Sequence, residues 1–210
     1  MKIEKERIID ALNGELPGIK AHDEVLGYER PTVDEVLSSE IDPRLSSVVF
    51  LIYPREDRWH FLLLKRNDYK GVHSGQVGLP GGSLEEGETE EDALIRELEE
   101  ETGYLLSSND IINKLTPLYI PPSNFIVNPF AAVIDECPEW VFDKREVNRG
   151  IEASLVDLLH PEILEEQNVF IRGGNVRLNV KSFPFGGEVV WGATAMILSE
   201  CKQILAKLRI

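Results

Sequence analysis

The stretch from Leu79 to Tyr104 reads LPGGSLEEGETEEDALIRELEEETGY. It begins with a proline and two glycines and then becomes strongly acidic, with ten Asp or Glu residues between Glu85 and Glu101 against one base, Arg96. This segment carries −9 of the chain's net charge of −15, which leaves −6 for all other residues. An acidic run is usually a solvated helix face or a disordered tail. Here, however, apolar residues recur at helical spacing, so we expect one side to pack on a core.

Residues 89–102 are predicted to form a helix. Thr89 is a plausible N-cap, Asp92 is placed to complete a capping box, and Gly103 is a typical residue for ending a helix. Residues three and four apart are neighbours on a helix surface, so several acids of this segment are predicted to share one side. These acids are Glu97, Glu100 and Glu101.

Carboxylates at this spacing repel one another unless a positive charge lies among them. Hard divalent cations prefer carboxylate oxygens, and Mg²⁺ in particular is held by a few carboxylates together with substrate phosphates. Arg96 and Glu88 are expected to pair with the acids or orient them. The sequence therefore predicts a Mg²⁺ or Mn²⁺ site on a helix that follows a Gly-rich loop.

The same residues resemble the Nudix box. Gly82 is followed after five residues by Glu88, and after seven more by Arg-Glu-Leu-Glu-Glu-Glu-Thr-Gly-Tyr. All charged and glycine positions of the family pattern are filled, and only Tyr104 departs, because it stands at the closing aliphatic position. The resemblance implies an α/β (α+β) fold: the Nudix α/β/α sandwich, with a mixed β-sheet between helices and the box as loop-helix-loop.

The resemblance also implies an activity, the hydrolysis of a diphosphate bond in a nucleoside diphosphate derivative. Metal ions would neutralise the diphosphate and lower the pKa of a water, and Glu97 or Glu101 would act as the base for that water. The implied catalytic residues are Glu97, Glu100, Glu101 and Arg96, and the implied metal site comprises Glu97, Glu100, Glu101 and Gly82.

The residues before the box resemble the upstream signature of the coenzyme A pyrophosphatase branch. That signature reads Leu-Leu-Thr-any-Arg, Ser or Ala, three of any, Arg, three of any, Gly, three of any, Phe-Pro-Gly-Gly. The matching positions are Leu62-Leu63, Arg66, Gly75 and Pro80-Gly81-Gly82. The departures are Leu64 for Thr, Asn67 for Ser or Ala, Gly71 for the second Arg, and Leu79 for Phe. Trp191-Gly192-any-Thr194-Ala195 resembles the same branch.

Several residues around the box are candidate substrate contacts. Basic side chains at the end of the strand 59–66 either face substrate phosphates or are solvated edge charges. His73 either serves the active site as a hydrogen-bonding group or general acid, or fastens its loop. Glu146 is either an additional acid from outside the box or a partner in a loop salt bridge. The candidate substrate-binding residues are Arg66, Lys70, His73, Gln76, Gly81 and Asn124.

Length and composition limit the class of protein. A chain of 210 residues with 42% hydrophobic content can bury a full core, and we expect residues 1–45 to be a helical and extended appendage to a domain at 46–210. The acidic balance argues against nucleic-acid binding. No apolar run is long enough for a membrane span or signal peptide, and Cys137 and Cys201 are expected to be thiols, so a cytoplasmic protein is predicted.

The rest of the chain alternates strands and short helices. Ser46–Tyr53 and Trp59–Arg66 are predicted to form a hairpin, as are the residues on either side of Gly173-Gly174-Asn175. Phe125–Ile134 is predicted to be an edge or bulged strand because Pro129 interrupts it. His22 is interpreted as an ordinary surface or capping histidine. A terminal amphipathic helix is predicted to end near Leu208, with Met196, Ile197, Ile204, Leu205 and Leu208 facing the core.

Three functions follow from these patterns. The favoured one is hydrolysis of coenzyme A or acyl-coenzyme A to 3′,5′-ADP and a 4′-phosphopantetheine. The second is hydrolysis of another diphosphate, such as ADP-ribose or a dinucleotide, because the departure at Gly71 removes an arginine from the signature. The third is a non-catalytic ligand-binding domain, against which the complete set of acids argues. The partner is in each case a small nucleotide, and homodimers are common among relatives.

Overall fold

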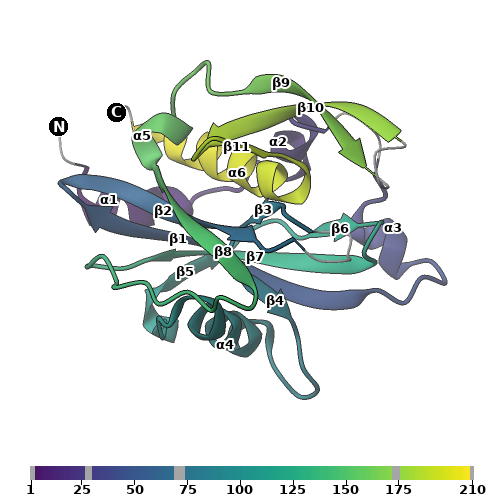
Figure 1. Ribbon diagram of the computed structural model, residues 1–210, viewed down its shortest axis with the longest axis horizontal. Helices are drawn as coiled ribbons and strands as arrows, with labels where there is room; N and C mark the ends of the chain where they lie inside the picture. Colours follow the sequence, from purple (N-terminus) through teal and green to yellow (C-terminus); the bar gives the residue numbers. More distant parts are fainter. Residues whose placement is uncertain (1–2, 27–29, 69–73, 172–175, 209–210) are drawn as a thin grey trace.

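The computed structural model describes residues 3–26, 30–68, 74–171 and 176–208. Its helices cover both faces of a mixed sheet (Figure 1). The α-helices are α1 (Lys5–Leu12), α2 (Ile19–Asp23), α3 (Val33–Leu37), α4 (Glu90–Thr102), α5 (Leu155–Leu158) and α6 (Gly192–Leu205). Two 3₁₀ helices are η1 (Ser108–Asp110) and η2 (Ala206–Leu208).

The main sheet has eight strands in the order β3-β2-β1-β7-β5, with β4 paired to β1, β6 to β7 and β8 to β2. The pairing of β1 with β7 is parallel, whereas the other pairings in this sheet are antiparallel. A second sheet has three strands in the order β11-β10-β9. The strands of the main sheet are β1 (Arg44–Arg55), β2 (Arg58–Arg66), β3 (Val77–Gly78), β4 (Gly81–Ser83), β5 (Ile111–Lys114), β6 (Leu118–Ile120), β7 (Phe125–Val133) and β8 (Val147–Ser154). Those of the second sheet are β9 (Glu165–Ile171), β10 (Val176–Phe185) and β11 (Glu188–Val190).

The side chains on the two faces of the main sheet build two separate cores, because successive residues of a strand point to opposite faces. On one face, Leu51 and Leu62 pack with Leu94 and Leu98 of α4. On the other face, Phe50, Ile52 and Phe61 pack with α6, and α4 and α6 therefore lie on opposite sides of the sheet (Figure 1). This layering confirms the predicted α/β/α sandwich with a mixed sheet.

The first hairpin is confirmed, with β1 and β2 paired from Ile52–Phe61 to Arg55–Arg58. The prediction of an edge strand is wrong, because β7 lies between β1 on one side and β5 and β6 on the other. The pairing of β7 with β5 does have a register irregularity, but it lies opposite Ala131 and Ala132 rather than at Pro129. Pro129 faces the gap between β5 and β6, and its carbonyl accepts a hydrogen bond from the Leu115 N–H at 2.8 Å. The missing proline N–H therefore falls where no ladder bond is required.

The N-terminal residues contribute to the core on the α6 face. Ile8 and Leu12 of α1 are fully buried there, and the indole N–H of Trp59 donates to the carbonyl of Ile3 at 2.7 Å. The interpretation of His22 as a surface residue is wrong, because only 2% of it is exposed. Its Nε2 lies 3.4 Å from a carboxylate oxygen of Glu200 on α6, a partner that no local sequence pattern connects to it.

The C-terminal half agrees with the sequence predictions where the structure describes it. β9 and β10 form an antiparallel hairpin up to the pair Ile171 and Val176, although the predicted turn residues lie outside the described part of the chain. All five residues of the predicted core stripe on the last helix are buried. Cys137 and Cys201 are both free thiols. Among the described residues, no helix has the length and apolar character that crossing a bilayer requires.

Candidate active site

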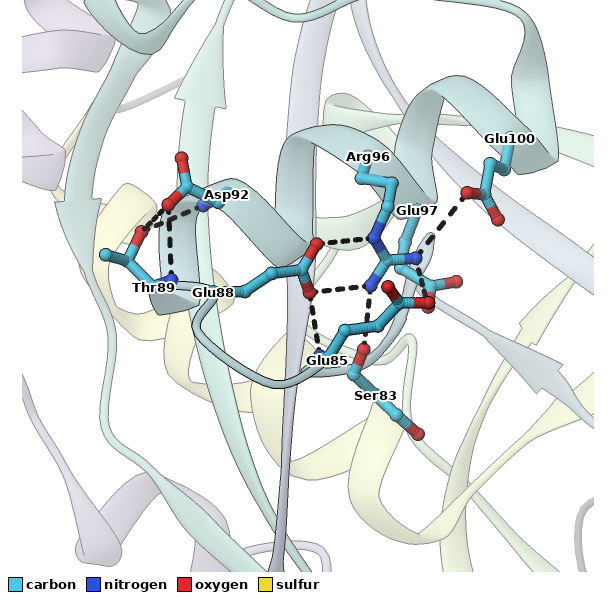
Figure 2. Close-up of polar contacts among 8 residues, drawn as sticks. All are labelled: Ser83, Glu85, Glu88, Thr89, Asp92, Arg96, Glu97 and Glu100. Carbon is cyan, nitrogen blue, oxygen red and sulfur yellow. Dashed lines mark hydrogen bonds and ion pairs between the residues drawn. The ribbon is translucent and has the colours of Figure 1, made fainter.

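The helix α4 has the ends that the sequence predicts. The Thr89 hydroxyl accepts a hydrogen bond from the Asp92 N–H at 3.1 Å, and the Asp92 carboxylate accepts from the Thr89 N–H at 3.2 Å. This reciprocal arrangement is a capping box, which satisfies two N–H groups that a helix leaves unpaired (Figure 2). Gly103 ends the helix in the left-handed conformation with φ of 71°. The caps fix where the acidic face of α4 begins and ends.

Arg96 is the centre of the polar contacts on this face (Figure 2). Its guanidinium donates to both carboxylate oxygens of Glu88, at 2.6 and 2.9 Å, and to the carbonyl of Ser83 at 2.9 Å. It also donates to Glu97 at 2.9 Å and lies 3.6 Å from Glu100. Hydrogen bonds from Arg96 and from the backbone of Glu85 lower the pKa of Glu88 to about 2. Arg96 thus orients the acids, as the sequence predicts.

The two glycines before the helix allow a carboxylate to approach the backbone closely. A Cβ on Gly82 would lie 2.3 Å from Cδ of Glu97, so a larger residue there would force Glu97 to move. Gly81 has φ of 136°, and a Cβ there would lie 2.1 Å from the carbonyl oxygen of Ser47. Gly81 is therefore restricted to glycine by its backbone conformation and neighbours, whereas Gly82 leaves the space in which the Glu97 carboxylate lies.

Glu101 is a buried carboxylate, since only 4% of the residue is exposed. One of its oxygens accepts a hydrogen bond from the Gly81 N–H at 2.9 Å. Burial raises the pKa of Glu101 to about 7, against the opposing effects of the Gly81 N–H and the charge of Arg66. Burial likewise raises the pKa of Glu97, against the hydrogen bond from Arg96. Both acids therefore lie where a positive charge would stabilise their ionised forms.

Glu146 comes from outside the box and lies near these acids. It precedes β8, and its carboxylate is 3.8 Å from a guanidinium nitrogen of Arg66 at the end of β2. Its negative charge also contributes to the raised pKa values of Glu97 and Glu101. The two alternatives that the sequence leaves open for Glu146 are thus compatible, because a loop ion pair brings this acid next to the acids of α4.

The donor chemistry of this site fits a hard divalent cation. Three carboxylates from α4 and one from the segment before β8 carry oxygen atoms of the kind that such a cation prefers, and the positive charges beside them are those of Arg96 and Arg66. Among the described residues, no three acidic, His or Cys side chains converge closely enough to hold a cation as they stand. The reason is that Arg96 draws Glu97 and Glu100 toward itself, whereas Gly81 holds Glu101.

The predicted substrate-binding residues have different surroundings. The backbone N–H of Arg66 donates to the carbonyl of Gln76 at 3.0 Å, so these two residues lie side by side at the end of β2. Gly81 contributes its N–H to Glu101. Lys70 and His73 lie outside the described residues.

Asn124 is a turn residue between β6 and β7. It has a positive φ of 54°, and its side chain accepts a hydrogen bond from the Tyr119 hydroxyl and donates one to the carbonyl of Asp42, both at 2.9 Å. These contacts give the Asn124 amide a role in the turn. The predicted contact with substrate stays a prediction.

Sequence reasoning missed the contacts of one residue next to the site. Asn67, noted only as a departure from the upstream signature, donates from its side-chain amide to the carbonyl of Lys144 at 2.9 Å. Its backbone N–H donates to the carbonyl of Glu146, also at 2.9 Å. The substitution of an amide for the usual Ser or Ala was the available signal, but the partner segment cannot be identified from the sequence.

Comparison with known proteins identifies the family. The family model described as "NUDIX domain" matches residues 42–149, which is 108 of the 210 residues. The mitochondrial coenzyme A diphosphatase NUDT8 of Homo sapiens is 30% identical over 145 residues, which cover 68% of this chain and 61% of that protein. A protein named as the uncharacterized Nudix hydrolase NudL, of Escherichia fergusonii, is 29% identical over 82% of this chain and 94% of its own length.

Solved structures show the same fold. A MutT/nudix family protein from Enterococcus faecalis superposes with a TM-score of 0.56 at 16% identity, over 97% of this chain and 75% of that one. The MutT protein from Methanosarcina mazei Go1 gives a TM-score of 0.54 at 17% identity, over 82% of this chain and 99% of that one. Nudix hydrolases act on small nucleotide substrates and generally use divalent cations. The chain therefore belongs to the Nudix family and is a hydrolase of diphosphate bonds.

Proposed function

We propose that this chain hydrolyses the diphosphate bond of coenzyme A or acyl-coenzyme A, and that the products are 3′,5′-ADP and a 4′-phosphopantetheine. The observation that carries the proposal is the group of acids Glu97, Glu101 and Glu146 beside the Gly81-Gly82 loop. An anionic diphosphate binds at such acids only when a divalent cation lies between them, because the charges otherwise repel. The upstream signature and the similarity to the human coenzyme A diphosphatase favour this substrate.

The cation in this proposal is Mg²⁺ or Mn²⁺. Glu97, Glu100 and Glu101, with Gly82, would hold it, and Glu146 would add a carboxylate from outside the box. When bound, the cation supplies positive charge to the diphosphate and lowers the pKa of a water. Arg96 keeps Glu88 and the acids of α4 in place through its five donors.

The reaction is an attack of water on one phosphorus of the diphosphate. One P–O bond forms from the water oxygen, and the P–O bond to the bridging oxygen breaks, so that the second phosphate leaves with that oxygen. The water proton passes to Glu97 or Glu101, both of which lie on the site side of α4. Arg66, Lys70, His73 and Gln76 are the proposed contacts to substrate.

A second candidate substrate is ADP-ribose or a dinucleotide. The observation that favours it is Gly71, which stands where the coenzyme A signature has its second arginine. If that arginine binds the 3′-phosphate of coenzyme A, its loss removes a bidentate contact that a neighbouring lysine replaces only as a point charge. A non-catalytic binding role has less support, because all the acids of the box are present.

The test is mass-spectrometric product analysis with coenzyme A, dephospho-coenzyme A and ADP-ribose in parallel, with Mg²⁺ and Mn²⁺ in separate reactions. We expect metal-dependent 3′,5′-ADP from coenzyme A, slower turnover of dephospho-coenzyme A, and turnover by Glu101→Gln that is lower by about 100-fold or more. Turnover of ADP-ribose alone would replace the first candidate by the second. Failure with all three substrates by folded, metal-loaded protein would favour the binding role. Assembly as a homodimer and a cytoplasmic location stay predictions.

A further inference from the structure

The segment between β7 and β8, residues 135–146 (hereafter the strap), is fastened to β2 by one residue. Asn67 follows the last residue of β2 and makes two hydrogen bonds of 2.9 Å to the strap. Its backbone N–H donates to the carbonyl of Glu146, and its side-chain amide donates to the carbonyl of Lys144. The side-chain bond is specific to an amide of this length, because a Ser hydroxyl is shorter and an Ala has no donor.

The strap is also fastened to the end of α4. The N–H of Val141 donates to the carbonyl of Thr102 at 2.8 Å, and the N–H of Asp143 donates to the carbonyl of Glu101 at 3.1 Å. These carbonyls belong to the last turn of the helix, where the intrahelical partners are missing. The strap therefore connects the last turn of α4, which contains the buried acid Glu101, to the end of β2, which contains Arg66.

These anchors determine where the Glu146 side chain lies. The strap is held on α4 at Asp143 and on β2 at Lys144 and Glu146, and it continues directly into β8, where Val147 pairs with Arg66. The Glu146 carboxylate is then 3.8 Å from Arg66. Without the bond to Lys144, the turn before Glu146 would lose its side-chain hydrogen bond to Asn67, the residue that follows β2.

We propose that Asn67 is a positioning residue that holds Glu146 at the cation site through the strap. The proposal rests on the proposed function in one respect, namely that Glu146 supplies a ligand to the divalent cation. Asn67 itself touches neither the cation nor the substrate. Residues that orient metal ligands typically change metal affinity by about 10- to 100-fold when they are replaced.

The experiment measures the dissociation constant of Mn²⁺ by electron paramagnetic resonance, without substrate. We expect Asn67→Ala to weaken Mn²⁺ binding about tenfold, the lower end of that range. The matched control is Asn113→Ala, which removes a part-buried side-chain amide bond of the same length, 2.9 Å, to the carbonyl of Leu12. Asn113 lies on β5, at the opposite edge of the sheet from the β2–β8 pair, so its loss should lower the melting temperature without changing the Mn²⁺ affinity.

A double-mutant cycle tests whether Asn67 acts through Glu146. Glu146→Gln should weaken Mn²⁺ binding at least as much as Asn67→Ala, and the double variant should bind no more weakly than Glu146→Gln alone. Multiplying effects in the double variant, or an unchanged affinity in Asn67→Ala, would overturn the proposal. Asn67→Ser, which restores the residue type of the signature, serves if the alanine variant does not fold, and it should also weaken binding.

The two proposals fail in different ways. Mn²⁺ binding that follows the cycle, together with no hydrolysis of coenzyme A, would overturn the proposed substrate and leave the role of Asn67 intact. Mn²⁺ binding that Glu146→Gln does not change would overturn the role of Asn67 while leaving the helix acids as ligands. A wild-type protein that binds no Mn²⁺ would overturn both.

Discussion

Two buried glutamates lie on opposite faces of the sheet and differ in their partners. Glu101 on α4 is 4% exposed, and among the described residues its carboxylate accepts one hydrogen bond, from the Gly81 N–H. Glu200 on α6 is fully buried, accepts three hydrogen bonds from Gly18 and Thr116, and lies 3.4 Å from His22. Burial raises the pKa of Glu101 to about 7. Burial opposes ionisation of Glu200 as well, but its contacts with His22 and Thr116 lower its pKa below the ordinary value.

The difference separates a carboxylate whose partners more than offset its burial from one whose partners do not. Glu200 has donors for both of its oxygens, so its negative charge ties the N-terminal residues to α6. Glu101 is buried to a similar degree, and among the described residues the Gly81 N–H and the charge of Arg66 do not offset that burial, which is costly unless a cation binds. Burial by itself therefore does not mark a functional acid, but burial with too few partners does.

The largest expected effect is on turnover. Glu101→Gln and Glu97→Gln should each lower kcat for coenzyme A about 100-fold or more, because they remove a base or a ligand that stabilises charge. Glu99→Gln is the matched control, since it changes an exposed acid of the same helix and should leave kcat within about threefold of wild type. Near-normal turnover in both site variants would refute the assignment of the metal site to α4.

The second expected effect is on the stability of the metal-free protein. Glu101 has a raised pKa, so the folded state binds more protons than the unfolded state between the ordinary value near 4.5 and about 7. Its contribution to the free energy of unfolding is therefore lost as pH rises through this range. Above pH 7, Glu101→Gln should be more stable than wild type by on the order of 3 kcal/mol.

Urea unfolding in the presence of a chelator, from pH 5 to pH 8, measures this difference. The gain of Glu101→Gln over wild type should shrink toward pH 5 and should also shrink when saturating Mg²⁺ is added to both proteins. If Glu101→Gln is less stable than wild type at every pH, the ionised Glu101 carboxylate does not destabilise the folded protein.

The third expected effect concerns Glu200, where the substitution should lower stability instead of raising it. The contribution of the wild-type carboxylate is also lost as pH falls instead of as pH rises. Glu200→Gln should lower the free energy of unfolding by about 2 kcal/mol, because buried donors lose their charged partner. Because the pKa of Glu200 is lowered, its stabilisation is present above the unfolded value near 4.5 and is lost as pH falls through the folded value. The difference between wild type and variant should therefore shrink in acid, while kcat per folded molecule stays unchanged. Lost turnover with intact stability would contradict the comparison.

The smallest expected effect concerns the start of α4. Thr89→Ala removes a capping box and should cost about 1 kcal/mol of stability. Thr32→Ala removes the capping box of α3, a helix of five residues, and serves as the matched variant. Both should keep kcat within threefold of wild type, as measured with unfolding curves and initial rates. A much larger loss of turnover in Thr89→Ala alone would give this cap a direct role in catalysis.

Features encoded within a few neighbouring residues were predictable from the sequence. Thr89, Asp92 and Gly103 lie within fifteen residues of one another, and both ends of α4 follow from them. The family and the sandwich fold follow from the box because its spacing is long and specific. The roles of the individual site residues stay predictions, and of these Lys70 and His73 lie outside the described residues.

Features that depend on distant partners were not predictable. His22 was misinterpreted because its partner Glu200 lies at the other end of the chain, and only the packing of α2 on α6 brings them together. Pro129 was misinterpreted because the gap between β5 and β6 is a property of the sheet rather than of the strand. The proximity of Glu146 to the box requires the strap, whose anchors at Asn67 and Glu101 come from two separate elements.

The burial of the first helix has a consequence for where this protein can be cut. The family match begins at residue 42, and a truncation designed from this match alone would start there. A truncation there would strip Ile8 and Leu12 from the core and remove Gly18 and His22 from Glu200. The Glu200 carboxylate would then lie next to a cavity and lack these two neighbours. The family match is therefore shorter than the set of residues that build the core of this chain.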